Sequence, residues 1–272
     1  MDNWKNQTVL ITGGSSGIGL ELSKKIILYV DRLIIFDKKK LNLSQITKSR
    51  VNKQKIIFCL GDISSTKDVK KLPRILINHN IVKIDILINN AGFAHYRFFK
   101  DLSFRQICSH ANVNFVGFLK ITKICLPYLL SSKADRKYII NNASVASEIP
   151  ITPNSVYGGA KAGMLHFSKL LNYELNPFNI YVKTILPGRV ETNFFDHISY
   201  KIRGTIPESK MTTTVSVITN ILINTISSSK IVFYAPKYWG LISFLLKTNF
   251  LKINILYNYI IKKRVARYLK SL

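Results

Sequence analysis

The sequence predicts an α/β fold in which helices cover both faces of a doubly wound parallel sheet of about seven strands. Short apolar runs alternate with helical patterns along the chain, and a glycine-rich turn joins the first run to the first helical pattern. Small and polar residues follow the ends of several runs, where ligands bind in sheets of this kind. The 272 residues, 47% of them hydrophobic, suit one domain over 1–272 with a basic, apolar C-terminal extension from about residue 236.

The first strand is expected at Thr8–Ile11 and the first helix at Leu20–Ile27. Glycines at such a junction let the backbone approach a pyrophosphate, which the helix N-terminus attracts. The spacing is Gly-x-x-x-Gly-x-Gly, which differs from the usual Gly-x-Gly-x-x-Gly, and a glycine-rich loop without a ligand is the alternative. The turn consists of Thr12, Gly13, Gly14, Ser15, Ser16, Gly17, Ile18 and Gly19.

The second strand, Leu33–Phe36, leads directly into Asp37. A carboxylate about twenty residues after the glycines suits a ribose 2′-hydroxyl and repels a 2′-phosphate, which favours NAD over NADP. Three lysines follow Asp37 at once, and their positive charge offsets the preference of Asp37, so NADP is the alternative cofactor.

The third strand, Ile56–Leu60, is followed by Asp62 and Ile63. Asp62 stands where a nucleotide base would lie, although an acid that caps a turn has the same pattern. The fourth strand is expected at Ile84–Ile88, before Asn89, Asn90, Ala91 and Gly92, which permit close backbone contact with a ligand.

A long helix is expected from Phe104 to Leu130 with Asn114 in its middle, where asparagine is a weak helix former. The fifth strand, Tyr138–Asn141, leads to Ser144. The sixth strand, Ile180–Leu186, leads to Pro187, Gly188, Val190 and Thr192, and the seventh is expected at 231–234.

Tyr157 and Lys161 lie four residues apart in a helix expected over 156–175, so their side chains share one face. An ammonium near a phenol favours the phenolate and lowers its pKa. We therefore expect Tyr157 to exchange a proton with a carbonyl or alcohol oxygen that Ser144 also contacts. Taken alone, the pair is more typical of a half-buried tyrosine beside a solvated lysine, and the rest of the chain is what favours the catalytic interpretation.

These motifs, in this order and spacing, resemble the short-chain dehydrogenase/reductase family over residues 8–192. The resemblance implies a Rossmann fold and catalysis by Asn114, Ser144, Tyr157 and Lys161. It implies that Tyr157 is the acid/base, that Ser144 polarises the substrate oxygen, that Lys161 binds the nicotinamide ribose, and that Asn114 supports a water leading to solvent. The other residues noted at the strand ends are implied to bind NAD or NADP, and the protein is expected to form homo-oligomers as its relatives do.

The segment between Thr192 and Met211 corresponds to the substrate-covering segment of that family. Its aromatic and apolar side chains suit a lipophilic substrate, and a segment that packs on its own core is the alternative. His197 has no identifiable partner there. The three cysteines have no metal-binding or redox spacing, and Cys59 and Cys125 are expected in the core, so we predict no metal site.

The net charge of +26 predicts attraction to anionic partners. From Ser209 onward there is no Asp or Glu, and apolar runs separate ten basic residues, which suits a helix in an anionic membrane interface. The alternative is that these runs complete the substrate pocket or a subunit contact. No nucleic-acid motif is present, so no nucleic-acid partner is expected. The N-terminus has no signal-peptide pattern and no uncharged apolar run approaches the ~20 residues of a membrane span, so we expect a cytoplasmic protein, peripheral at most.

The sequence therefore predicts an NAD(P)-dependent oxidoreductase that acts on a ketone or secondary alcohol, with a lipid-like substrate suggested. An NADPH-specific ketoacyl or ketolipid reductase and a non-catalytic nucleotide-sensing scaffold are the alternatives.

Overall fold

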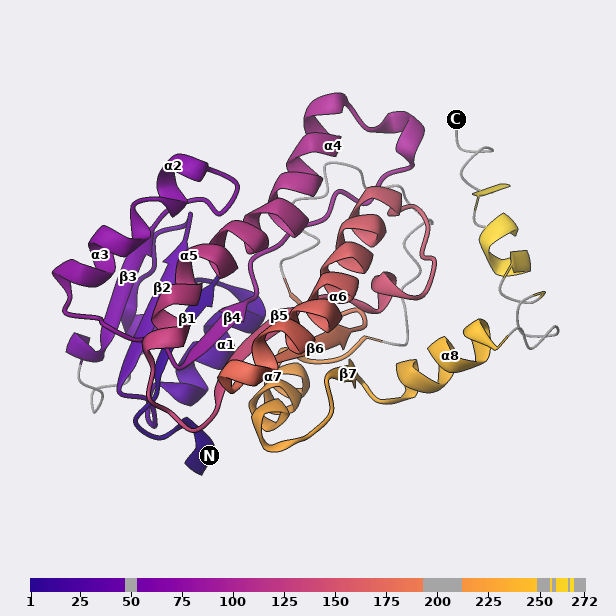
Figure 1. Ribbon diagram of the computed structural model, residues 1–272. Coiled ribbons are helices and arrows are strands. Elements are labelled where there is room, and N and C mark those ends of the chain that lie inside the picture. Colours follow the sequence, from indigo (N-terminus) through magenta and orange to yellow (C-terminus); the bar gives the residue numbers. More distant parts are fainter. Residues whose placement is uncertain (47–52, 193–211, 249–254, 256–257, 264, 267–272) are drawn as a thin grey trace.

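The computed structural model describes residues 1–46, 53–192, 212–248, 255, 258–263 and 265–266. Seven strands within these ranges form one sheet in the order β3-β2-β1-β4-β5-β6-β7, and every pair of neighbours is parallel. Helices flank this sheet (Figure 1), which confirms the predicted doubly wound class. The strands are β1 (Thr8–Thr12), β2 (Arg32–Asp37), β3 (Ile56–Leu60), β4 (Ile86–Asn89), β5 (Lys137–Asn142), β6 (Ile180–Pro187) and β7 (Val232–Ala235).

The helices are α1 (Gly17–Ile26), α2 (Thr66–Val69), α3 (Leu72–Asn78), α4 (Phe104–Ala111), α5 (Phe118–Ser131), α6 (Ser155–Leu175), α7 (Val215–Asn224) and α8 (Tyr238–Lys247). A π-helical segment, Asn112–Gly117, joins α4 to α5. The fourth strand begins two residues later than predicted, because the carboxylate of Asp85 turns inward and accepts a hydrogen bond from the Thr8 amide at 2.8 Å.

Side-chain alternation in the strands divides the core between the two faces of the sheet. In β1, Val9 and Ile11 point towards the face covered by α1 and α7, and Leu10 points towards the face covered by α3, α5 and α6. All three are fully buried. Two covered faces explain why the strands are continuously apolar rather than alternating in polarity.

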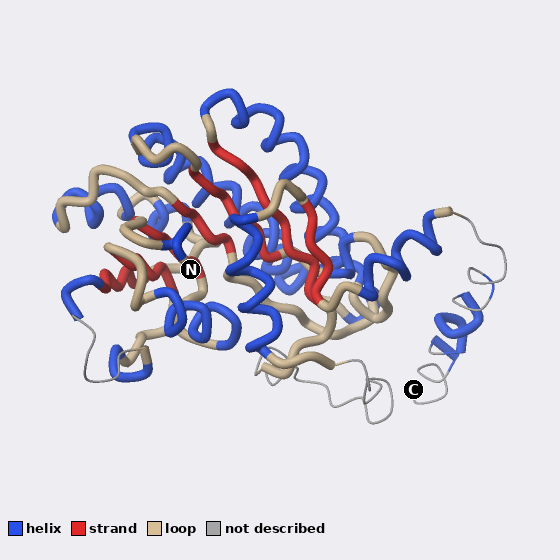
Figure 2. Tube along the Cα trace, turned by 90° about the horizontal axis from the view of Figure 1, so that it is seen from below, coloured by secondary structure: helices blue, strands red, loops and turns tan. Residues whose placement is uncertain are grey.

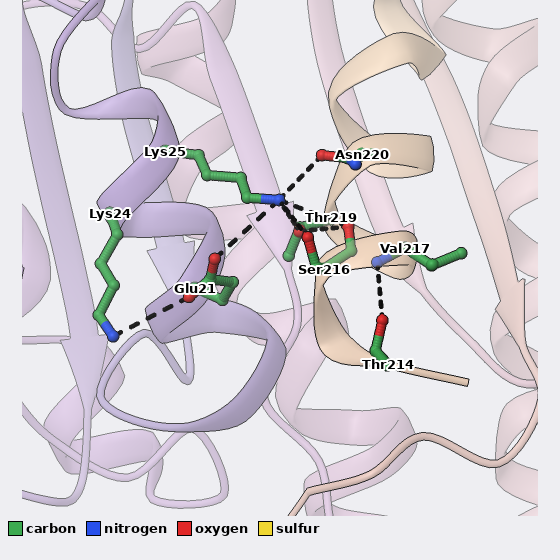
Figure 3. A network of polar contacts seen from close by, with 8 residues as sticks. All are labelled: Glu21, Lys24, Lys25, Thr214, Ser216, Val217, Thr219 and Asn220. Carbon is green, nitrogen blue, oxygen red and sulfur yellow. Dashed lines mark hydrogen bonds and ion pairs between the residues drawn. The ribbon is translucent and has the colours of Figure 1, made fainter. Parts of the chain in front are cut away.

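A polar network joins α1 to α7 on one face of the sheet (Figure 3). The Lys25 ammonium donates to the side chains of Asn220 at 2.8 Å, Ser216 at 3.0 Å and Thr219 at 3.0 Å. It also lies 4.0 Å from a Glu21 carboxylate oxygen. One cation thus satisfies acceptors on two helices that are far apart in the sequence.

The continuous helical run Phe104–Ser131 is long and apolar enough to cross a membrane by length and composition, with a mean hydropathy of 1.4 over an 18-residue window. It packs on the sheet instead, since Ile121, Cys125 and Leu129 in α5 are fully buried in the core. We therefore assign it as a core helix. Cys59 and Cys125 are buried as predicted, and burial raises the pKa of the Cys59 thiol to about 12.

Candidate active site

A cleft of about 1060 Å³ opens at the carboxyl ends of the strands. That volume is at the upper end of the range for small-molecule sites. Eighteen of the twenty-three residues that the sequence analysis names for this site line it. The other five, which are buried and lie behind its surface, are Thr12, Gly14, Gly19, Asn89 and Asn114.

The glycine turn forms one end of the cleft. Gly13 and Gly17 have φ values of +69° and +52°, a left-handed conformation that favours glycine. At Gly19 a Cβ atom would lie 2.1 Å from the carbonyl oxygen of Gly13, so no side chain fits there. Gly13 and Gly17 therefore present backbone without a side chain to the cleft near the N-terminus of α1, which suits a dinucleotide pyrophosphate.

Thr12 and Asn90 connect this turn to the end of β4. The Thr12 hydroxyl accepts hydrogen bonds from the amides of Asn90 at 3.0 Å and Ala91 at 3.1 Å. The Asn90 amide group donates to the Gly13 carbonyl at 2.9 Å, and its oxygen accepts from Asn142 at the end of β5 at 2.9 Å. Three strand ends are thereby held together beneath the cleft.

Asp37 closes the turn at the end of β2. Its carboxylate accepts hydrogen bonds from the Ser15 amide at 2.9 Å and the Lys39 amide at 3.0 Å, and it is 9% exposed. This arrangement directs a negative charge into the end of the cleft where an adenosine ribose would lie.

Asp62 lines the cleft beside Ile63 and also caps a turn, so it fits both alternatives left by the sequence. One of its oxygens accepts from the amide of Ser64 at 2.8 Å and from its hydroxyl at 2.7 Å. The remaining oxygen is the one available to a ligand base.

Ser144, Tyr157 and Lys161 meet in the middle of the cleft. Tyr157 and Lys161 are one turn apart on α6, and the Lys161 ammonium lies 5.9 Å from the centre of the Tyr157 ring. It donates to the backbone carbonyl of Asn142 at 2.8 Å. Ser144, between β5 and the short turn Val145–Ser147, hydrogen-bonds with Tyr157. A substrate oxygen placed between the two hydroxyl groups would contact both.

The expectation that Lys161 lowers the pKa of Tyr157 is wrong for this structure. Burial raises the pKa of Tyr157 to about 12, against which the hydrogen bond with Ser144 acts in the lowering direction. Burial also lowers the pKa of Lys161 to about 7. Desolvation dominates the pKa of both groups, so at neutral pH the tyrosine is protonated.

Asn114 lies in the π-helical segment, where the widened helix turns its side chain towards the end of β4. Its amide oxygen accepts from the Phe93 amide at 3.2 Å, and its nitrogen donates to the Phe93 carbonyl at 2.8 Å. A Cβ atom at Gly92 would lie 2.9 Å from the Asn114 oxygen and 3.5 Å from the Lys161 ammonium. Because Gly92 has no side chain, the Asn114 oxygen and the Lys161 ammonium both lie close to its backbone.

The end of β6 completes the cleft with Pro187, Gly188, Val190 and Thr192. Thr192 lies over Gly17, since a Cβ atom there would be 3.5 Å from the Thr192 methyl group. A Cβ atom at Gly188 would lie 2.3 Å from the indole nitrogen of Trp239 in α8. The C-terminal extension thus contacts the end of β6 at the cleft. The sequence had not decided whether this extension reaches the pocket.

Several residues of the cleft were not identified from the sequence. Phe93, His95 and Tyr96 follow β4, and Ile151 and Asn154 precede α6. Their positions depend on how the loops fold back, although their proximity to Asn90 and Tyr157 in the sequence was a usable hint. The predicted substrate-covering segment with His197 lies outside the described residues.

The model of the short chain dehydrogenase family matches residues 7–202. The chain belongs to the short-chain dehydrogenase/reductase family. It is 34% identical over 197 residues to the "11-beta-hydroxysteroid dehydrogenase-like 3" of Arabidopsis thaliana, a match over 71% of this chain. The matched part spans 62% of the length of that relative.

Solved structures share the whole fold. A short chain dehydrogenase from Burkholderia cenocepacia in complex with NADP superposes with a TM-score of 0.77 at 18% identity, covering 93% of this chain and 98% of that one. A short chain dehydrogenase/reductase from Burkholderia phymatum in complex with NAD gives a TM-score of 0.78 at 17% identity, covering 92% and 95%. At these identities the likeness establishes the Rossmann fold.

Proposed function

We propose that the protein is an NAD(P)-dependent oxidoreductase that interconverts a ketone and a secondary alcohol. One observation supports this above the others. The hydrogen-bonded hydroxyl groups of Tyr157 and Ser144 face the same cleft as a glycine turn whose tight packing leaves no room for a side chain at Gly19. A proton donor and a dinucleotide cradle in one cleft are what hydride transfer to a carbonyl requires.

The bound nicotinamide supplies or accepts the hydride. Ser144 orients the substrate oxygen by a hydrogen bond, and Tyr157 gives that oxygen its proton. Because the pKa of Tyr157 is raised to about 12, the group is protonated at neutral pH and suited to act as the acid in ketone reduction. Lys161, when charged, stabilises the phenolate left after proton transfer. Reduction is therefore the direction that we propose.

Tyr157→Phe tests this assignment, because it removes one oxygen and leaves the ring packing in place. We expect turnover to fall by about 10²–10⁴-fold, the usual contribution of a positioned acid. NADH binding, followed by nicotinamide fluorescence, should stay within about twofold. Full activity in the variant would refute the assignment, and turnover in the parent protein would exclude the scaffold alternative.

We propose NAD(H) as the preferred cofactor, supported by the Asp37 carboxylate at the ribose end of the cleft. A 2′-phosphate there would meet a buried negative charge. Titration with NADH and NADPH should show tighter NADH binding, and Asp37→Ser should narrow or reverse the difference. Tighter NADPH binding to the parent protein would mean that Lys38 and Lys39, which also line the cleft, outweigh Asp37.

For the substrate we propose a lipophilic ketone. Phe93, Val145 and Ile151 line the cleft beside Tyr157 and offer apolar contacts. The name of the Arabidopsis relative refers to a hydroxysteroid, which is in keeping with this class. We propose a cytoplasmic enzyme that works as a homo-oligomer beside a membrane. A screen with long-chain ketones against short polar ones tests the substrate class, and a preference for the polar set would contradict it.

A further inference from the structure

Helix α8 is apolar on two sides, and the part of the chain that the structure describes covers only one of them. Its inner side packs on the core beneath the catalytic loop through Trp239, Ile242 and Leu246. On its outer side Tyr238 is 40% exposed, Leu241 62% and Phe244 60%. These three outer residues follow at intervals of three and so share one face, which we call the outer face of α8.

The charged residues that flank α8 along the chain are all basic. Lys237 precedes α8 and Lys247 ends it, and both are exposed. Beyond α8 the described residues continue the pattern, with exposed Ile255, Tyr259 and Ile260 followed by Lys262 and Lys263. The chain has no acidic residue from Ser209 onward. Figure 1 shows α8 next to β7 at one end of the sheet, and the short helical segment drawn in yellow after it lies further from the sheet (Figures 1 and 2).

We propose that the outer face of α8 docks on an anionic lipid surface. Exposed Tyr, Leu and Phe side chains insert at the boundary between headgroups and acyl chains, and flanking lysines pair with lipid phosphates. Charge complementarity selects this partner over a second copy of the chain. Two outer faces brought together would oppose lysines to lysines, whereas an anionic bilayer matches both the apolar and the positive groups.

Docking there would place the bilayer beside the substrate cleft. The carboxylate of Glu148, in the loop after Ser144, accepts hydrogen bonds from Ser243 at 2.6 Å and Lys247 at 2.5 Å, which hold α8 against the catalytic loop. Trp239 on the same helix contacts Gly188 at the cleft. A lipophilic ketone would pass from the bilayer to Tyr157 along this edge. This last step rests on the proposed function, but the docking itself does not.

Co-sedimentation of the full chain with vesicles tests the docking directly. One set contains phosphatidylcholine alone, and the other contains phosphatidylcholine with phosphatidylserine. The double variant Leu241→Ser/Phe244→Ser removes the apolar groups and Lys237→Gln removes one charge. Phe178→Ser is the matched control, because Phe178 is 54% exposed but follows α6.

We expect the parent protein to bind anionic vesicles at least about tenfold more tightly than neutral ones, and high salt to weaken that binding. Each apolar substitution should cost about tenfold in partitioning, since each removes a large side chain from the interface. Lys237→Gln should cost about fivefold, and the Phe178 control should bind as the parent does.

Equal vesicle binding by the double variant and the parent protein would overturn the proposal. Failure of the parent protein to bind anionic vesicles would also overturn it. Sedimentation velocity without lipid gives a further test. If the parent protein is a dimer and the double variant is a monomer, the outer face is a subunit interface and the proposal is overturned. Melting temperatures and turnover of a water-soluble ketone check that the variants are folded. Because vesicle binding needs no substrate, a protein that docks without turnover would refute the proposed function and leave the docking intact.

Discussion

Glu148 is the residue whose removal should release α8 most selectively. Its carboxylate accepts hydrogen bonds from the hydroxyl groups of Tyr234 at 2.5 Å and Ser243 at 2.6 Å, and from the Lys247 ammonium at 2.5 Å. Tyr234 belongs to β7, and the other two donors belong to α8. Since Glu148 follows the catalytic Ser144 loop, these bonds join the last strand and the last described long helix to the active site.

The cost of Glu148→Ala follows from the exposure of the donors. Ser243 is 1% exposed and Tyr234 is partly buried. Loss of the carboxylate that accepts their hydrogen bonds therefore costs about 1–3 kcal/mol for each donor when no water replaces it. The Lys247 side chain is 54% exposed and regains water, so its ion pair adds at most about 1 kcal/mol. Water will reach part of this site, and we expect a total of about 2–4 kcal/mol. Glu148→Gln keeps one acceptor oxygen and should cost about 1 kcal/mol.

Hydrogen exchange measures this loss locally. Amides in α8 should exchange about 30- to 1000-fold faster in Glu148→Ala, while those of α1 on the opposite side of the sheet should not change. The chain has two tryptophans, and Trp4 is 1% exposed in the core, so a change in fluorescence would report Trp239. Unchanged exchange in α8 would show that apolar packing alone holds the helix and would refute the reasoning.

The same site should respond to acid. Burial raises the pKa of Glu148, but the hydrogen bonds from Lys247, Ser243 and Tyr234 outweigh it and leave the pKa below the ordinary value of 4.5. A carboxyl whose pKa is lower in the folded state stabilises that state above its unfolded pKa. The contribution is therefore present at neutral pH and is lost as the pH falls through the folded value. Protection of α8 should decline in that acidic range, and Glu148→Gln should remove the dependence.

Two further substitutions test the contacts that shape the fold and the turn. Lys25→Met removes the donor that joins α1 to α7 and should lower the free energy of unfolding by about 1–2 kcal/mol in urea titrations, whereas a change under ~0.3 kcal/mol would mean that water replaces the contacts. Gly19→Ala places a Cβ atom 2.1 Å from the Gly13 carbonyl and should weaken NADH binding at least about tenfold by fluorescence, because the turn must open. Gly159→Ala is its control, since nothing lies within 4 Å of a Cβ atom there, and equal effects of the two would contradict the turn geometry.

The fold could be predicted because its signals are local. The apolar run at Thr8–Ile11, the glycines after it and Asp37 at the end of the next run each depend on a few neighbouring residues. Parallel pairing then brings the strand ends together without further information. The same logic placed Asn90, Ser144 and Tyr157 at one cleft, although Asn90 and Tyr157 are far apart in the chain.

What the sequence could not supply depends on contacts between distant residues. Nothing near Glu148 shows that Ser243 and Lys247 bond to it, and nothing near Gly188 shows that Trp239 lies against it. The sequence left open whether the C-terminal extension reaches the pocket or a membrane. In the structure α8 reaches the cleft through Trp239, and its other side leaves Leu241 and Phe244 exposed, the face for which we propose the membrane role.

The ionisation of the catalytic pair also depends on burial, which spacing alone does not reveal. Lys161 is 3% exposed, and burial lowers its pKa to about 7. In ketone reduction Tyr157 becomes a phenolate as it gives up its proton, and a charged Lys161 stabilises that product, whereas a neutral one does not. We therefore expect kcat/KM for reduction to be level below about pH 7 and to fall about tenfold per unit above it. Lys161→Met should be slower and flat across the same range. A parent profile that stays level to pH 9 would show that bound cofactor or solvent keeps Lys161 charged and that burial does not control this site.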